Sequence, residues 1–351
     1  MDILLDDIPY NKSLYPFAVL KSLVHIRVGI LTIYEKWQTA FPGKIILSSQ
    51  LTGNETESTD YLKIPGNLIP SKLLFERIKS GNYNPLVTDD CKVLRRPWEI
   101  FQFNDWAIRE DFELVTHGRD SEEISPGNKI VSFENIFVEP GAEINFSILN
   151  ASTGPIYIGK NAAILEGCMI RGPFALGEGS KLKMGTKIYG ATTLGPYCLG
   201  GGEIKNSILM GYSNKSHDGY LGDSVLGEWC NIGGGTSNSN LKNNAGVIRV
   251  WSYEENDFIE AGERCGLLMG NYSRCAINTS FNTGTVAGIS CNIFGNSFPS
   301  KYIEDFTWGS DIYILEKAIN DINNWKKLKG FEITQDEIDS LKILYELKQQ
   351  Q

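Results

Sequence analysis

The stretch from residue 156 to residue 195 reads IYIGKNAAILEGCMIRGPFALGEGSKLKMGTKIYGATTLG and repeats itself every six residues. Seven aliphatic residues recur at that interval: Ile158, Ile164, Ile170, Leu176, Leu182, Ile188 and Leu194. A period of six matches neither the 3.6-residue turn of a helix nor the two-residue alternation of a strand. It fits a coil of flat faces with one inward side chain per face, stacked turn upon turn. The spacing therefore predicts a parallel β-helix with a triangular turn of about 18 residues.

The same spacing continues further along the chain after an interruption. It returns at Leu226 and Ile232, and again in a row that comprises Met269, Cys275, Phe281, Ala287 and Ile293. Tight corners need small residues, and 26 of the 36 glycines lie between Gly154 and Gly295. A β-sandwich is the alternative, but its strands would alternate with a period of two. The break from Thr236 to Cys265 is expected to leave the coil as a loop, which is either a binding loop or a tolerated insertion.

The composition of the chain argues against several classes of protein. The chain has 351 residues, enough for more than one domain, and 33 basic against 42 acidic residues give a net charge of −9. This charge argues against nucleic acid or an anionic membrane as the main partner. Seven scattered cysteines without a C-x-x-C pair predict free thiols in a reducing cytoplasm. The acidic N-terminus predicts no signal peptide, and no apolar run reaches the ~18 residues of a membrane span.

Changes in composition and in hydrophobic spacing divide the chain into four segments. Residues 1–110 are expected to form an α/β module, 111–155 a linker, 156–298 the β-helix and 299–351 a helical segment. Thr334 and Glu337 form a capping box that opens the last predicted helix. We expect the C-terminal helices to cap the open end of the coil or to join subunits. The predicted fold class is mainly β, with an α/β N-terminal module and C-terminal helices.

The chain has only three histidines, His25, His117 and His217, and the last of them is the candidate for chemistry. His217 lies in the polar stretch NKSHDGYLGD at 214–223, where the six-residue register slips. An irregular polar stretch on a solenoid should face outward, and an imidazole there suits general-base work near neutral pH. The alternative is a surface histidine without a catalytic role.

The region around His217 resembles the acetyltransferase half of the bifunctional glucosamine-1-phosphate acetyltransferase and N-acetylglucosamine-1-phosphate uridyltransferase family. The matching residues are Glu203-Ile204-Lys205, His217, Tyr220-Leu221-Gly222-Asp223, Asn231-Ile232-Gly233-Gly234-Gly235-Thr236 and Asn240. The resemblance implies a hexapeptide-repeat acyltransferase, whose fold is a left-handed parallel β-helix. Such proteins are usually trimers with active sites between neighbouring helices, so the resemblance implies a homotrimer.

The resemblance also implies roles for individual residues. His217 would be the general base, and acetyl-CoA the acyl donor. The positions that match substrate ligands of the family are Lys187, Lys205, Tyr220, Asn231 and Asn240. Lys187 stands where the family has a phosphate-binding arginine, and Asn240 would approach the substrate amine. Gly234 and the turn around Gly266 would lie along the pantetheine arm of the coenzyme.

The N-terminal stretch resembles the sugar nucleotidyltransferase-like module that precedes such a β-helix. The matching residues are Asp6-Asp7, Arg27-Val28-Gly29-Ile30-Leu31-Thr32-Ile33 and Glu35-Lys36-Trp37. Lys21-Ser22 stands in place of the family's Arg-Pro pair, and the glycine-rich phosphate loop is absent. Asp6 and Asp7 are weak candidate ligands for Mg²⁺, which the module would need if it were active.

Three functions follow from the sequence. The first is an acetyl-CoA-dependent acyltransferase that acts on an amino-sugar phosphate or a nucleotide sugar in cell-envelope sugar-nucleotide biosynthesis. The second is a sugar-1-phosphate nucleotidyltransferase whose β-helix serves for trimerisation. The third is a non-catalytic scaffold that binds a nucleotide sugar.

Overall fold

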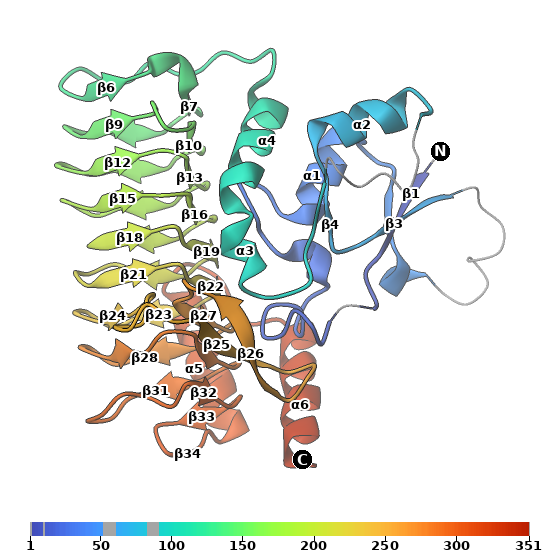
Figure 1. Ribbon diagram of the computed structural model, residues 1–351, viewed down its shortest axis with the longest axis vertical. Coiled ribbons are helices and arrows are strands. Elements are labelled where there is room, and N and C mark those ends of the chain that lie inside the picture. The colour runs from blue at the N-terminus through green and yellow to red at the C-terminus, as the bar shows by residue number, and fades with distance from the viewer. Residues whose placement is uncertain (1, 10, 52–60, 83–90, 351) are drawn as a thin grey trace.

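The centre of the molecule is a parallel β-solenoid that runs from Lys129 to Trp308 in the computed structural model, which describes residues 2–9, 11–51, 61–82 and 91–350 (Figure 1). Three sheets form its walls, which we name faces A, B and C. Face A consists of β7 (Ile136–Val138), β10 (Ile156–Ile158), β13 (Phe174–Leu176), β16 (Thr192–Leu194), β19 (Ile208–Gly211), β22 (Val225–Glu228), β27 (Leu267–Met269), β30 (Thr285–Ala287) and β32 (Tyr302–Ile303). Face B consists of β8 (Glu143–Ile144), β11 (Ala163–Ile164), β14 (Lys181–Leu182), β17 (Leu199–Gly200), β20 (Asn214–Lys215), β23 (Asn231–Ile232), β28 (Arg274–Cys275), β31 (Asn292–Ile293), β33 (Thr307–Trp308) and β34 (Asp311–Ile312). Face C consists of β6 (Lys129–Val131), β9 (Ile148–Asn150), β12 (Met169–Arg171), β15 (Lys187–Tyr189), β18 (Glu203–Lys205) and β21 (Tyr220–Gly222), followed by the pair β24 (Ser237–Asn238) and β29 (Ser280–Phe281).

The six-residue repeat fills the interior of this prism, as predicted. Every aliphatic residue of the 158–194 series is at most 2% exposed, and all belong to one hydrophobic core. Ile158 pairs with Leu176, 18 positions later, and Leu176 pairs with Leu194, so that like residues stack in register. Burial of these stacked side chains stabilises the coil because each turn removes apolar surface of its neighbours from water. The prediction of a mainly β fold is confirmed.

The solenoid extends beyond the predicted 156–298 at both ends. Ile136 pairs with Ile156, 20 positions later, because the first coils carry extra residues in the turn around Ser152. This longer spacing hides the first coils from a search for a period of six. The segment 111–155, predicted as a linker, therefore contains the end of a helix and the first solenoid strands, and the last parallel strand ends at Trp308.

The predicted break in the repeat leaves the coil as a loop. Thr236 to Asn238 still follow the coil, and the chain departs after them and returns at Cys265. The loop carries an antiparallel hairpin of β25 (Ile248–Ser252) and β26 (Asp257–Gly262). Ile248 and Val250 of this hairpin lie in a hydrophobic core shared with face A and the N-terminal module.

The N-terminal module is an α/β unit packed against face A (Figure 1). Its parallel sheet has the order β2-β1-β3. The elements of the module are β1 (Asp2–Asp6), η1 (Leu23–His25), α1 (Ile33–Ala40), β2 (Ile45–Leu47), η2 (Ser48–Gln50), β3 (Tyr61–Pro65), β4 (Leu68–Ile69), α2 (Lys72–Lys79), β5 (Lys92–Val93), α3 (Glu99–Gln102) and α4 (Asn104–Thr116). Buried Asn104 ties the module to the solenoid, because it accepts from the Gly29 amide at 2.8 Å and donates to the Ala191 carbonyl at 2.9 Å.

The C-terminal helices α5 (Leu315–Lys327) and α6 (Gln335–Gln349) pack along the corner between faces A and B. The prediction that they cap the open end is therefore wrong, whereas the capping box at Thr334 is confirmed. The physical reason is a column of aromatic side chains at successive A–B corners. The Tyr212 and Trp229 rings stack at 4.3 Å and Tyr197 stacks on Tyr212 at 5.4 Å, with the edge of Phe331 against all three rings.

Replacing Phe331 with alanine should loosen this C-terminal segment. Three edge-to-face contacts are lost, each worth roughly 0.5–1.5 kcal/mol beyond area burial, and we expect the free energy of unfolding to fall by about 2 kcal/mol because the ring is partly exposed. Urea denaturation measures the loss. Leu328→Ala is the control, because that side chain is 77% exposed. Equal stabilities of the two variants would contradict the anchoring role of Phe331.

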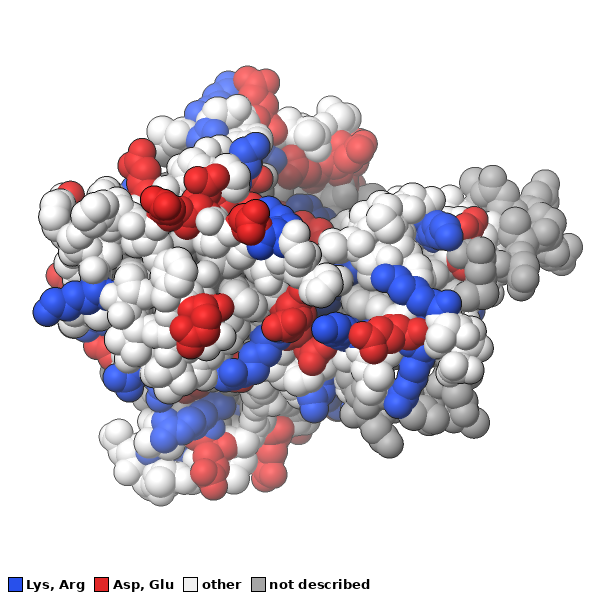
Figure 2. Space-filling view, turned by 90° about the horizontal axis from the view of Figure 1, so that it is seen from above, with Lys and Arg blue, Asp and Glu red and all other residues white. Residues whose placement is uncertain are grey.

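Charge is distributed without a single-sign patch on the end of the molecule seen in Figure 2, where acidic and basic side chains intermingle. The net charge of −9 agrees with this picture. Among the described residues, no helix combines the length and apolar character that a membrane crossing requires. All seven cysteines are buried, and none of them forms a disulfide bond.

Candidate active site

His217 stands at a corner of the solenoid between face B and face C, after β20 and before β21, and its side chain is exposed. Glycines occupy the same corner on both neighbouring coils. A Cβ atom at Gly201 would meet the backbone of Ser216, and a Cβ atom at Gly234 would lie 3.5 Å from the Cβ atom of His217. The imidazole is therefore flanked by bare backbone, which leaves room for a ligand along the wall.

Lys187, Lys205 and Tyr220, which the sequence singled out, lie on face C, together with Tyr189, which it did not. Lys187 pairs with Glu203 on the next coil, and Glu203 pairs with Tyr220 on the coil after that. Tyr189 donates its hydroxyl hydrogen to Glu203, and this hydrogen bond raises the pKa of Tyr189 to about 12. Lys205 lies with its ammonium 6.0 Å from the centre of the Tyr189 ring. Two cations, Lys187 and Lys205, therefore share one open face.

Asn240 and Tyr220 are brought together where the chain leaves face C after β24. The Asn240 amide donates to the Tyr220 hydroxyl at 3.1 Å and also to the Asp223 carboxylate. Asn206 donates to the other Asp223 oxygen at 2.6 Å. Burial, followed by the charge of Asp223, raises the pKa of Tyr220, so the phenol stays protonated. Sequence reasoning used Asp223 only as part of a motif and missed that this buried carboxylate anchors Asn240.

Asn231 lies around the corner from these residues, on face B. It pairs with Asn214 and Arg274 of the adjacent coils, and the Asn214 amide reaches it at 3.4 Å. Lys329 of the C-terminal segment donates to Asn214 at 2.9 Å. The residues of one chain that are predicted to bind the sugar phosphate therefore lie on two faces, which meet at the His217 corner.

The two glycines predicted along the coenzyme lie at opposite edges of face C. Gly234 sits beneath His217 at the B–C corner. Gly266 sits at the C–A corner, where an added Cβ atom would lie 2.1 Å from the Gly222 carbonyl oxygen, so that no side chain fits between the coils there. Gly266 lies under the Asp223 corner, since its amide donates to the Asp223 carbonyl at 2.8 Å.

The acids proposed as metal ligands have protein partners. Asp6 forms an ion pair with Lys63 at 2.8 Å, and buried Asp7 accepts from the Ser49 amide at 2.9 Å and the Ser49 hydroxyl at 2.7 Å. Residues 2–9, 11–51, 61–82 and 91–350 contain no group of three or more His, Cys, Asp or Glu side chains that could hold a metal ion. Both acids therefore contact other residues of the module.

A buried ion pair holds the part of the module that matches the nucleotidyltransferase pattern. The Lys36 ammonium of α1 binds the Asp111 carboxylate of α4, and both side chains are at most 2% exposed. One Asp111 oxygen also accepts from the Ile30 amide at 2.8 Å and the Leu31 amide at 3.0 Å. Desolvation lowers the pKa of Lys36 and raises the pKa of Asp111. This pair was not foreseen, because 75 positions separate its members.

Comparisons with known proteins agree with both halves of the architecture. The sequence model of a family described as sugar nucleotidyl transferase matches residues 3–90 and 84–120. The "Bifunctional protein GlmU" of Methanocaldococcus jannaschii is 31% identical over 117 residues, which are 33% of this chain and 28% of the relative. The protein of the same name from Methanococcus vannielii is 25% identical over 275 residues, 75% of this chain and 55% of the relative.

A third relative, from Sulfurisphaera tokodaii, is named "Bifunctional sugar-1-phosphate nucleotidylyltransferase/acetyltransferase" and is 27% identical over 204 residues, 57% of this chain and 43% of the relative. The chain spans between about a quarter and about half of the length of these relatives. In this chain, a module that matches the sugar nucleotidyl transferase model thus precedes a β-solenoid. The chain is therefore similar to the bifunctional sugar nucleotidyltransferase/acetyltransferases of the GlmU type.

Proposed function

We propose that the protein is an acetyl-CoA-dependent acyltransferase that acetylates an amino-sugar phosphate or a nucleotide-linked amino sugar. The observation that carries the proposal is the exposed imidazole of His217 at the edge of a face that presents Lys187 and Lys205. Two ammonium groups suit the phosphate of such a substrate, and the Asn240–Tyr220 pair supplies uncharged hydrogen-bonding groups for the sugar.

The proposed reaction forms an amide and breaks a thioester. The substrate amine attacks the acetyl carbonyl carbon while His217 takes a proton from the amine nitrogen. The tetrahedral intermediate collapses with cleavage of the C–S bond, and the proton passes from the imidazole to the departing thiolate, which leaves as free thiol. A histidine suits both transfers because its ordinary pKa lies near neutral pH.

A homotrimer is the assembly we propose for this activity. Exposed apolar side chains gather on face C and on the B–C corner that carries His217, namely Phe146, Ile148, Met169, Met184 and Ile277, which are between 41% and 71% exposed. Exposed apolar side chains that gather on one side of a solenoid are typical of a surface that another chain covers. A site between two copies would combine the face-C residues of one copy with Asn231 on face B of the next.

A sugar-1-phosphate nucleotidyltransferase is the second candidate, since the family match covers the N-terminal module. The structural partners of Asp6 and Asp7 speak against it, because a nucleotidyltransferase needs free carboxylates for Mg²⁺. The third hypothesis, a non-catalytic scaffold, predicts no turnover in either assay.

The deciding experiment compares two assays on the purified protein. We expect release of free thiol from acetyl-CoA in the presence of glucosamine 1-phosphate or a nucleotide-linked amino sugar, and we expect light scattering to give three times the mass of one chain. Release of pyrophosphate from a nucleoside triphosphate, dependent on Mg²⁺ and a sugar 1-phosphate, would instead support the nucleotidyltransferase. Absence of thiol release with every amino sugar would refute the acyltransferase.

A further inference from the structure

A lysine occupies an inward-facing position of the solenoid. Along face B, Leu182 pairs with Gly200, and Gly200 pairs with Lys215. A Cβ atom at Gly200 would lie 2.7 Å from the side chains of Leu182 and Leu194, so this row points into the aliphatic core. Lys215 itself is 1% exposed, and the missing side chain of Gly200 leaves it space. Burial of an ammonium in such a row is costly unless its hydrogens are bound.

The hydrogens of this ammonium are directed at the corner that carries His217. The Lys215 side chain donates to the Gly201 carbonyl oxygen at 3.1 Å and to the carbonyl oxygen of His217. It therefore joins the corner of one coil to the corner of the next from inside the prism. Burial lowers the pKa of Lys215 to about 8, an effect that the charge of Asp218 partly offsets.

The backbone of this corner needs such support. A main-chain bond from the Gly235 amide to the Asp218 carbonyl at 2.9 Å joins this corner to the following coil, and Lys215 adds a bond to the Gly201 carbonyl of the preceding coil. The corners next to His217 consist of Gly201 and Gly202, and Gly219 follows His217 with a φ of +121°. Glycine backbone is the most flexible, and loss of about 1 Å of alignment of a catalytic group costs on the order of 100-fold in rate.

We propose that Lys215 is a positioning residue for His217, whose ammonium fixes the main chain from which the imidazole projects. This inference rests on the proposed acyltransferase function. It differs from a purely structural role, because an apolar side chain of the same length suits the aliphatic row at least as well as an ammonium does. Removing the charge should therefore preserve the fold and reduce the reaction rate.

The test uses Lys215→Met in the full-length protein, with Leu182→Met in the same inward row as the matched control. We expect kcat for acetyl transfer to fall at least ~10-fold in Lys215→Met, with KM for acetyl-CoA within about twofold of wild type. Amide hydrogen exchange of residues 216–219 should become faster, and the midpoint of thermal unfolding should be no lower than in the control. Unchanged kcat together with unchanged exchange would overturn the proposal.

A double-mutant cycle separates positioning from general damage. If Lys215 acts through His217, Lys215→Met should alter the residual rate of a His217→Ala protein by less than about twofold, because the group that Lys215 positions is already gone. A further drop as large as in the wild-type background would overturn the proposal. Failure of the acyltransferase function is recognised separately, since wild-type protein would then release no thiol, whereas the exchange measurement still reports on the corner itself.

Discussion

Replacement of His217 by alanine is expected to reduce kcat for acetyl transfer at least ~100-fold, which is the usual contribution of a general base. The imidazole is exposed and stands between glycine-lined coils, so its removal should leave the unfolding temperature unchanged. KM for acetyl-CoA should change little, because only proton transfer is lost. Thiol release under saturating substrate measures the effect.

The matched control for this experiment is His117→Ala. His117 is also exposed but lies at the C-terminal end of α4, far along the chain from the solenoid corner. We expect it to retain wild-type activity. A His217→Ala protein within about threefold of the wild-type rate would remove this histidine from the mechanism, even if the protein acetylates its substrate.

Replacement of Asp111 by alanine should be among the most destabilising single changes in the chain, with a loss of about 3–5 kcal/mol in the free energy of unfolding. The substitution leaves the Lys36 ammonium buried without its counter-charge, and it leaves the Ile30 and Leu31 amides without their acceptor. Urea denaturation followed by tryptophan fluorescence reports on the loss directly, because buried Trp37 directly follows Lys36 in α1.

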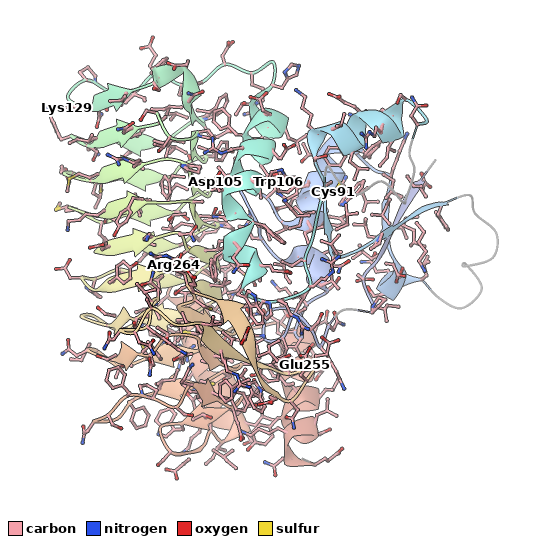
Figure 3. All side chains as sticks on the ribbon, viewed as in Figure 1. Cys91, Asp105, Trp106, Lys129, Glu255 and Arg264 are labelled. Atoms are coloured by element: carbon pink, nitrogen blue, oxygen red, sulfur yellow. The ribbon has the colours of Figure 1, made fainter. Side chains whose placement is uncertain are left out.

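Asp105→Ala is the control for Asp111→Ala, since both carboxylates lie on α4. Figure 3 labels Asp105. Asp105 is about half-exposed and pairs with Arg109 one turn away at 2.6 Å, an interaction worth about 0.3–0.5 kcal/mol. The double variant Lys36→Met/Asp111→Leu should recover much of the lost stability, because it removes both buried charges. Equal stability of the two single variants would contradict a central role for the buried pair.

The sequence predicts those features that depend on local spacing. The interior row from Ile158 to Leu194, the loop after Asn238 and the capping box at Thr334 each follow from residues close together in the chain, and all are found. The first coils escaped detection because extra turn residues lengthen their period to 20. The position of the C-terminal helices depends on aromatic residues that stack only after the coil has formed.

The candidate site was predictable in its residue types and less so in its arrangement. The motif around His217 predicted an outward-facing imidazole, and His217 is exposed at the corner before the strand that begins at Tyr220. The motif did not reveal that Asn231 lies on face B, because sequence spacing alone does not show where the coil turns from one face to the next. Lys215 was read as part of a polar loop, and its burial became visible only from its pairing with Gly200.

The hairpin β25–β26 bears on how the two halves of this protein can be separated. Its apolar side chains pack with those of the N-terminal module and of face A in one hydrophobic core. At the hairpin turn, Arg96 of the module donates a hydrogen bond to Glu255 at 2.9 Å. Cleavage of the chain between the module and the solenoid would expose a large apolar surface on each fragment. The module and the solenoid therefore form one rigid unit. No hinge between them lets the two halves change orientation independently.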